Sequence, residues 1–174
     1  MFSVKNLLFL ITTASALVVT KRDAAQIRSD LQLINTDTNA LKSAADRYSG
    51  GLFGAIPVQN AADKLEDDIN TATDNANASA PVSDSEAADI ISYINNTLQP
   101  SVDAALTSIE NKRSQFTSAG LKGSVQDTLA TLRKDTNEYG QALLAKAPAS
   151  QQASGNAALT RIDNDFAATQ AFYA

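Results

Sequence analysis

Residues 83–116 read SDSEAADIISYINNTLQPSVDAALTSIENKRSQF, the longest amphipathic segment of the chain. Ser83 and Glu86 have the spacing of a capping box, which predicts that a helix begins here. Apolar or small residues then recur at three- and four-residue steps, which places them on one helical face. They are Ala87, Ile91, Ile94, Leu98, Val102, Ala105, Ile109 and Phe116. Pro100 removes a backbone donor mid-segment, so we expect a helix kinked or split there and covered by the remaining helices.

Two further helices are predicted on the N-terminal side. Residues 24–48 carry an unbroken alternation of four- and three-residue steps that ends at Gly50-Gly51, which predicts one long helix. A second helix is predicted over 58–76, and the polar run from Thr73 to Ser83 is expected to be a loop.

The connection between these two helices is unusually apolar. Its candidate contact residues are Leu52, Phe53, Ile56 and Val58. One interpretation is that Phe53, Ile56 and Val58 plug one end of the bundle, because an apolar residue just before a helix often packs back onto it. The alternative is an exposed apolar contact site, or a lid that the flanking glycines allow to move.

Two more helices are predicted after the central segment. Residues 120–123 form a turn, and Ser124 with Asp127 resembles a helix cap, so a helix is expected from there to Lys146. Pro148 stops it, and a last helix is expected over 150–173. The fold class is therefore all-α, an antiparallel bundle of about five amphipathic helices.

The N-terminus has the features of a secreted protein. An apolar run follows Lys5, and Ala14-Ser15-Ala16 resembles a signal-peptidase site, so residues 1–16 are predicted to be a signal peptide. Residues 17–22 are predicted to be a propeptide that ends in a dibasic site, which leaves 23–174 as a single domain. This apolar run is too short for a transmembrane span, and no second one follows it. Asn77 and Asn95 begin glycosylation sequons, and Asn77 is the favoured one because it is expected in a connection.

Composition argues against several classes of function. The chain has no cysteine and no histidine, so the usual base of nucleophilic enzymes and the main zinc ligand are missing. We expect no catalytic residue, metal site or cofactor. The net charge of −5 and the absence of a basic patch argue against nucleic acid as a partner.

Small residues on the helical faces leave two outcomes open for the interior. Either the helices approach closely, or bulky neighbours hold them apart around an apolar cavity that suits a fatty acyl chain. The candidate lining residues are Leu31, Ile34, Leu65, Ile69, Ile91, Ile94, Leu98, Val102, Leu106, Ile109, Leu129, Leu132, Tyr139, Ile162 and Phe166.

One stretch resembles a known family. The run Leu98-Gln99-Pro100-Ser101-Val102-Asp103-Ala104-Ala105-Leu106, with Ile109, Lys112-Arg113 and Phe116 after it, is similar to the fungal hydrophobic surface binding protein A and cell-wall galactomannoprotein family. The resemblance implies a non-enzymatic protein, secreted, extracellular or associated with the cell wall. It implies binding to a hydrophobic polymer surface and recruitment of a cutinase-type hydrolase. The alternative that it implies is a mannoprotein that encloses a long-chain fatty acid.

Overall fold

The computed structural model describes residues 23–174 in full and, before them, only the backbone course from residue 5. The predicted signal peptide, 1–16, and propeptide, 17–22, therefore lie outside the residues described in full. The helices are α1 (Lys5–Arg47), α2 (Ile56–Ala78), α3 (Asp84–Tyr93), α4 (Gln99–Asn111), α5 (Arg113–Ser118), α6 (Lys122–Lys146) and α7 (Gln152–Tyr173). Short 3-10 turns over Phe53–Ala55 and Ala149–Gln151 precede α2 and α7. The described part of the chain contains no strand, which confirms the all-α class.

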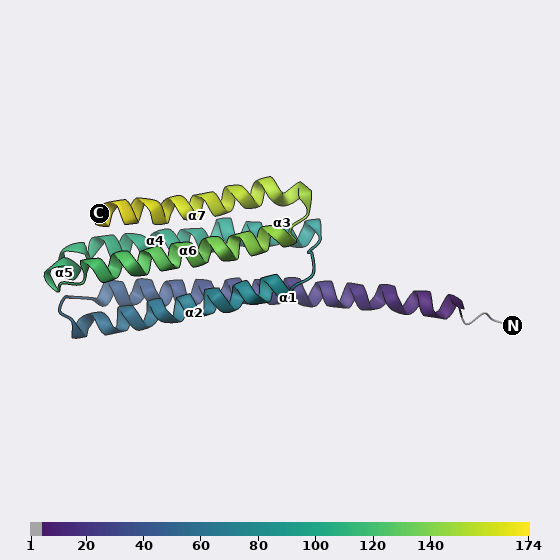
Figure 1. Ribbon diagram of the computed structural model, residues 1–174, viewed down its shortest axis with the longest axis horizontal. Helices are drawn as coiled ribbons and strands as arrows, with labels where there is room; N and C mark the ends of the chain where they lie inside the picture. Colours follow the sequence, from purple (N-terminus) through teal and green to yellow (C-terminus); the bar gives the residue numbers. More distant parts are fainter. Residues whose placement is uncertain (1–4) are drawn as a thin grey trace.

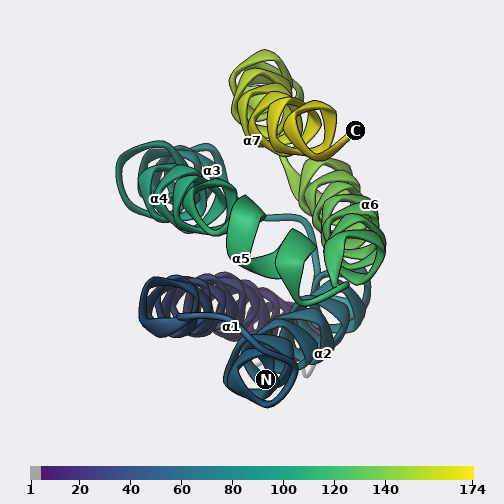
Figure 2. The same cartoon turned by 90° about the vertical axis from the view of Figure 1, so that its left-hand side faces the viewer.

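Five rods form the bundle, and successive rods run in opposite directions as predicted (Figure 1). One rod consists of α3 and α4 together, and α5 is a short helix at one end. Around the bundle, α1 packs on α2 and α4, α2 on α6, α6 on α7, and α7 on α4. Figure 2, which looks along the rods, shows this closed ring.

The expectation that the remaining helices cover residues 83–116 is met on two sides only. The α3–α4 rod is one wall of the ring, in contact with α1 on one side and α7 on the other. The physical reason is that its apolar residues occupy a single face, whereas a rod at the centre of the four others would have to be apolar on all sides. The ring therefore encloses an interior that only side chains can fill.

The local signals in this segment are confirmed. The backbone N–H of Ser83 donates to Glu86 Oε2 at 2.9 Å, and the backbone N–H of Glu86 donates to Ser83 Oγ at 3.4 Å. A π-helical turn over Ile94–Leu98 splits the segment, and Pro100 lies in the first turn of α4, a position that tolerates proline. A further break at Lys112, which separates α5 from α4, was not predicted.

Helix boundaries differ from the prediction at two places. Helix α2 continues through residues 73–78, so only 79–83 form a loop. Helix α6 begins at Lys122 rather than Ser124, and its N-cap residue, Leu121, gives no side-chain bond. The predicted cap is wrong because Gly120, at a φ of 74°, already turns the chain into α6.

Aromatic side chains close the α5 end of the bundle. The rings of Tyr48 and Phe116 stack with centroids 4.4 Å apart, and both side chains are buried. The hydroxyl of Tyr173 donates to the carbonyl oxygen of Ile109 at 2.7 Å, which ties the last turn of α7 to α4. These contacts hold the helices together at the end of the bundle where the loop between α1 and α2 also lies.

Candidate functional site

Three apolar cavities lie within the bundle. The α3 cavity, about 70 Å³, is bordered by residues of α1, α3, α6 and α7, among them Ile27, Ile90 and Leu159. The central cavity, about 50 Å³, is bordered by all five rods. The loop cavity, about 200 Å³, lies beneath Leu52 and Ile56 at the α5 end. Almost every residue that borders them is apolar.

The cavities form a row because neighbours share walls. Leu98, Thr136, Tyr139 and Ile162 border both the α3 cavity and the central cavity. Leu41, Ile109, Leu129 and Leu132 border both the central cavity and the loop cavity. Movement of these shared side chains would join the three spaces into one apolar channel along the bundle.

All fifteen candidate lining residues border the α3 cavity or the central cavity. The α3 cavity has Leu31, Ile91 and Ile94; the central cavity has Ile34, Leu65, Ile69, Val102, Leu106, Ile109, Leu129, Leu132 and Phe166; both have Leu98, Tyr139 and Ile162. Contact of these residues with a lipid stays a prediction.

Other walls of the α3 cavity were missed. They are Ile27, Val82, Ile90, Leu143, Leu144 and Leu159. A usable signal was the pair of glycines inside α6 and α7, since a mid-helix glycine costs about 1 kcal/mol and therefore points to a close approach. A Cβ on Gly140 would lie 2.4 Å from Leu159 Cδ1, and one on Gly155 would lie 2.7 Å from Leu144 Cδ2.

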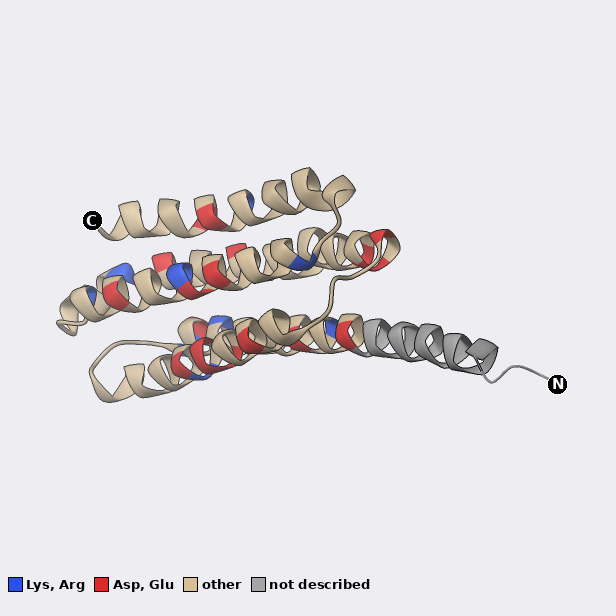
Figure 3. Ribbon diagram, turned by 45° about the vertical axis from the view of Figure 1, so that its right-hand side comes forward, with Lys and Arg blue, Asp and Glu red and all other residues tan. Residues whose placement is uncertain are grey.

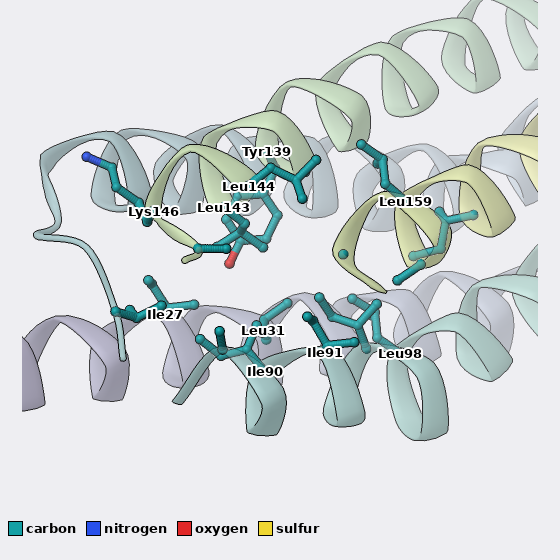
Figure 4. Close-up of a pocket in the computed structure, with 18 of the residues that line it drawn as sticks. Ile27, Leu31, Ile90, Ile91, Leu98, Tyr139, Leu143, Leu144, Lys146 and Leu159 are labelled. Carbon is teal, nitrogen blue, oxygen red and sulfur yellow. The ribbon is translucent and has the colours of Figure 1, made fainter. Parts of the chain in front are cut away.

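One polar side chain in this interior has no partner. Tyr139 is 4% exposed, and its hydroxyl makes no hydrogen bond. Figure 4 shows its oxygen pointing from α6 into the α3 cavity, towards the apolar side chains of α1 and α3. Burial, and secondarily the negative charge of Asp30, raise the pKa of Tyr139, so the phenol is neutral and can donate.

The loop between α1 and α2 is apolar and exposed. Leu52, Phe53 and Ile56 are 63%, 88% and 50% exposed, so the interpretation of Phe53 and Ile56 as a plug is wrong. Only Val58 packs inside, because α2 begins at Ile56 and turns that position towards the core. Gly50 and Gly51 adopt φ values of 120° and 78°, a conformation that glycine favours, and this turn directs the loop outward.

The loop itself carries no charge. Residues 48–62 include no Asp, Glu, Lys or Arg. Figure 3 shows the acidic and basic residues along the rods, whereas the α1–α2 turn is uncharged. An exposed apolar segment without charge is typical of a surface that contacts apolar material.

The two sequon asparagines have different surroundings. Asn77 lies in the last turn of α2, not in a connection as predicted, and it is exposed. Asn95 lies in the π-helical turn, where its side-chain oxygen accepts a hydrogen bond from Arg161 at 3.1 Å. Glycosylation of either residue stays a prediction.

Residues 23–174 hold no group of three or more side chains suited to a metal ion. Among the described helices, none has the length and apolar character needed to cross a membrane.

The model of the family "Hydrophobic surface binding protein A" matches residues 24–145. The solved structure of Afmp4p in complex with palmitic acid is 30% identical, with 87% of this chain and 99% of that one covered and a TM-score of 0.83. Ligand binding domains 1 and 2 of the Penicillium marneffei MP1 protein, both solved with arachidonic acids, give TM-scores of 0.82 and 0.81. Their identities are 12% and 17%, over 87% and 86% of this chain and 99% and 95% of theirs, so they show the fold alone. Among curated protein sequences, none matches the chain.

Proposed function

The chain belongs to the hydrophobic surface binding protein A family, and from that premise we propose that it adsorbs to hydrophobic surfaces and holds a long-chain fatty acid within its bundle. The observation that carries the proposal is the row of apolar cavities that share walls along the interior. The relative that is 30% identical was solved with palmitic acid, which supports the same ligand class here.

Admission of an acyl chain requires the shared side chains between the cavities to move apart. At about 50 to 200 Å³, each cavity is smaller than the roughly 300–1,000 Å³ of ordinary ligand pockets. Burial of each methylene group contributes about 0.8 kcal/mol, so a long chain can offset the displacement of several shared side chains. The cavities of the free protein thus mark the path of the ligand rather than its full volume.

The loop provides the contact with a surface. Leu52, Phe53 and Ile56 present apolar side chains to solvent, and Leu52 and Ile56 also border the loop cavity. One segment therefore meets both the surface and the interior. A lipid at a polymer or wax surface would enter through this segment.

Native mass spectrometry with palmitic acid tests the interior site. The wild-type protein should bind palmitic acid stoichiometrically. Ala158 is buried against the α3 cavity, so Ala158→Leu should fill part of that cavity and lower the bound fraction. The adjacent Ala157 is exposed, which makes Ala157→Leu the matched control with wild-type binding. Absence of any adduct in the wild type would refute the fatty-acid role.

Depletion from solution by polyester particles tests the surface role independently. Protein that stays in solution in the presence of a large particle area would contradict it. Addition of a cutinase-type hydrolase to the same particles tests recruitment, which should appear as more bound hydrolase when this protein is present.

We also propose an extracellular location and no catalytic activity. The small-residue pattern at Ala14-Ser15-Ala16 and the pair Lys21-Arg22 support removal of residues 1–22, and the exposure of Asn77 supports a glycan there. The intact mass and N-terminal sequence of the protein recovered from the culture medium test its secretion, the removal of residues 1–22 and the glycan on Asn77. Esterase or glycosidase turnover by the pure protein would contradict the non-enzymatic role.

A further inference from the structure

The junction between the α3 cavity and the central cavity carries hydroxyl groups in otherwise apolar walls. Tyr139 and Thr136, one turn apart on α6, border both cavities there. The central cavity has one more hydroxyl, that of Thr38, which already donates to the carbonyl oxygen of Ile34 at 2.8 Å. The Tyr139 hydroxyl, in contrast, has no partner.

An unpartnered buried hydroxyl is costly and therefore informative. Leaving a buried donor unsatisfied costs about 1–3 kcal/mol, whereas phenylalanine would fill the same space at no such cost. Other buried tyrosines of the described chain have partners: Tyr173 donates to Ile109, and Tyr48 to carbonyl oxygens of Gly51 and Gln115. Tyr139 is the exception, and its oxygen points into the space where a ligand would lie (Figure 4).

The charges nearby disfavour a carboxylate at this point. Asp30 is buried on α1 and close enough to Tyr139 for its negative charge to raise the pKa of the phenol. A second anion beside it would be repelled in this low-dielectric interior. Among the described residues that border the two cavities, the one cation is Lys146, and it lies two turns along α6 from Tyr139, about 10.5 Å away.

The order of groups along the channel follows from these positions. The ammonium of Lys146 donates to the carbonyl oxygen of Asn77 at 2.9 Å and has two further protons to donate. A carboxylate would therefore be favoured at the Lys146 end of the α3 cavity, and the chain would then extend past Tyr139 into the central cavity. The group that meets the Tyr139 hydroxyl is consequently in the middle of the chain and not at its head. A plain hydrocarbon leaves that hydroxyl unsatisfied.

We propose that the bundle selects acyl chains with a hydroxyl or carbonyl oxygen near the middle, and that Tyr139 recognises this oxygen by a hydrogen bond. The inference rests on the proposed fatty-acid binding and names the chemical class of its ligand. Tyr139 is a specificity-determining residue, because apolar burial supplies affinity for either kind of chain.

Matched ligands and matched variants test the proposal. Dissociation constants are measured by calorimetry for stearic acid and for a hydroxystearic acid with its hydroxyl near the middle of the chain. The wild type should bind the hydroxy acid about two- to tenfold more tightly, the gain expected from one net hydrogen bond. Tyr139→Phe should lose this preference and keep its affinity for stearic acid.

The control is Tyr93→Phe. This change also removes a phenol hydroxyl, but Tyr93 borders none of the three cavities and lies under the guanidinium of Arg28. It should retain the wild-type preference. Thermal melts establish that both variants fold.

The outcomes separate the inference from the function on which it rests. Equal affinity of the wild type for the two acids, or a preference that survives in Tyr139→Phe, overturns the inference and leaves fatty-acid binding intact. An equal loss of both acids in Tyr139→Phe also overturns it, because the tyrosine would then hold the carboxylate. Failure of the wild type to bind either acid refutes the proposed fatty-acid binding itself.

Discussion

Replacement of Leu52 and Phe53 by alanine should weaken adsorption to hydrophobic solids without changing the fold. Both side chains are mostly exposed in the α1–α2 loop, so their loss removes little internal packing. The chain offers a control of identical composition. Leu33 and Phe172 are 44% and 46% exposed but lie on different helices, α1 and α7, so Leu33→Ala with Phe172→Ala dismantles no continuous patch.

The expected magnitude follows from exposure. Leu52 and Phe53 are 63% and 88% exposed, together about one and a half fully exposed side chains. Complete burial of one such side chain contributes about 1.5–3 kcal/mol, and a flat surface covers roughly half of what solvent reaches. The pair therefore contributes about 1–2 kcal/mol, or about a five- to thirtyfold change in the adsorption constant.

Adsorption isotherms on polyester beads measure this constant, and circular dichroism melts verify that each variant is folded. The loop variant should shift the isotherm by the stated factor, and the control variant by less than about twofold, since its two side chains cannot meet one flat surface together. Equal shifts for the two variants would refute the assignment of adsorption to the loop. So would an unchanged isotherm for a folded loop variant.

Two further predictions concern the contact between α6 and α7. Two hydrogen bonds from Arg133, 2.7 and 2.9 Å long, lower the pKa of Asp163 from 3.8 to about 2, so this carboxylate stabilises the fold above its ordinary pKa. Asp163→Asn should lower the free energy of unfolding by about 1 kcal/mol at neutral pH, as measured by urea titration. The difference between variant and wild type should vanish as pH falls from 3.8 towards 2. A difference that does not change with pH would contradict this role of the Asp163 carboxylate. Gly140→Ala should push Leu159 into the α3 cavity and reduce fatty-acid binding, whereas Gly123→Ala, which has open space around it on the same helix, should leave binding unchanged and add up to about 1 kcal/mol of stability. Undiminished fatty-acid binding by Gly140→Ala would contradict the claim that the displaced Leu159 occupies the space of the ligand.

The five rods were predictable because the signals for them are local. A helix that buries one face must repeat apolar residues every three or four positions, and Leu31, Ile34, Leu65 and Ile69 do so and are buried. Caps and prolines act within one turn of the chain, which is why the capping box at Ser83 appears where the sequence predicts it. The family resemblance drawn from residues 98–106 is confirmed by the family match over 24–145.

The arrangement of the rods was not predictable in the same way. An amphipathic stripe shows that one face is covered but not which rods cover it. Residues 83–116 were expected to be covered by the remaining helices and instead form one wall of the ring. The break at Lys112 was not predicted because no glycine or proline lies at this position. It arises where α5 folds across the end of the ring and Phe116 stacks on Tyr48, a contact between residues far apart in sequence.

The same distinction between local and three-dimensional features applies to the candidate site. Residues on inward stripes border any interior that the rods enclose, so their periodicity was sufficient to find them. The state of one polar atom depends on every neighbour in three dimensions. Periodicity therefore placed Tyr139 on an inward face, but nothing in the spacing of residues indicated that its hydroxyl has no partner. The exposure of Phe53 depends likewise on the direction in which a glycine turn releases the loop.

Small residues on the helical faces were expected to allow either close helix approach or an apolar cavity. Both outcomes occur, in different parts of the bundle. Ala45, Ala72 and Ala76 are fully buried and border none of the three cavities, so they allow close helix approach. The interior of the ring is different, because five rods with one apolar stripe each surround a space that no helix occupies. Side chains from opposite walls meet there only partly and leave cavities that share walls. Since the loop cavity lies beneath the exposed Leu52 and shares walls with the central cavity, the proposed adsorption and the proposed lipid uptake would use the same row of apolar cavities. A surface that draws Leu52 and Ile56 outward would uncover the entrance to the interior in the same movement.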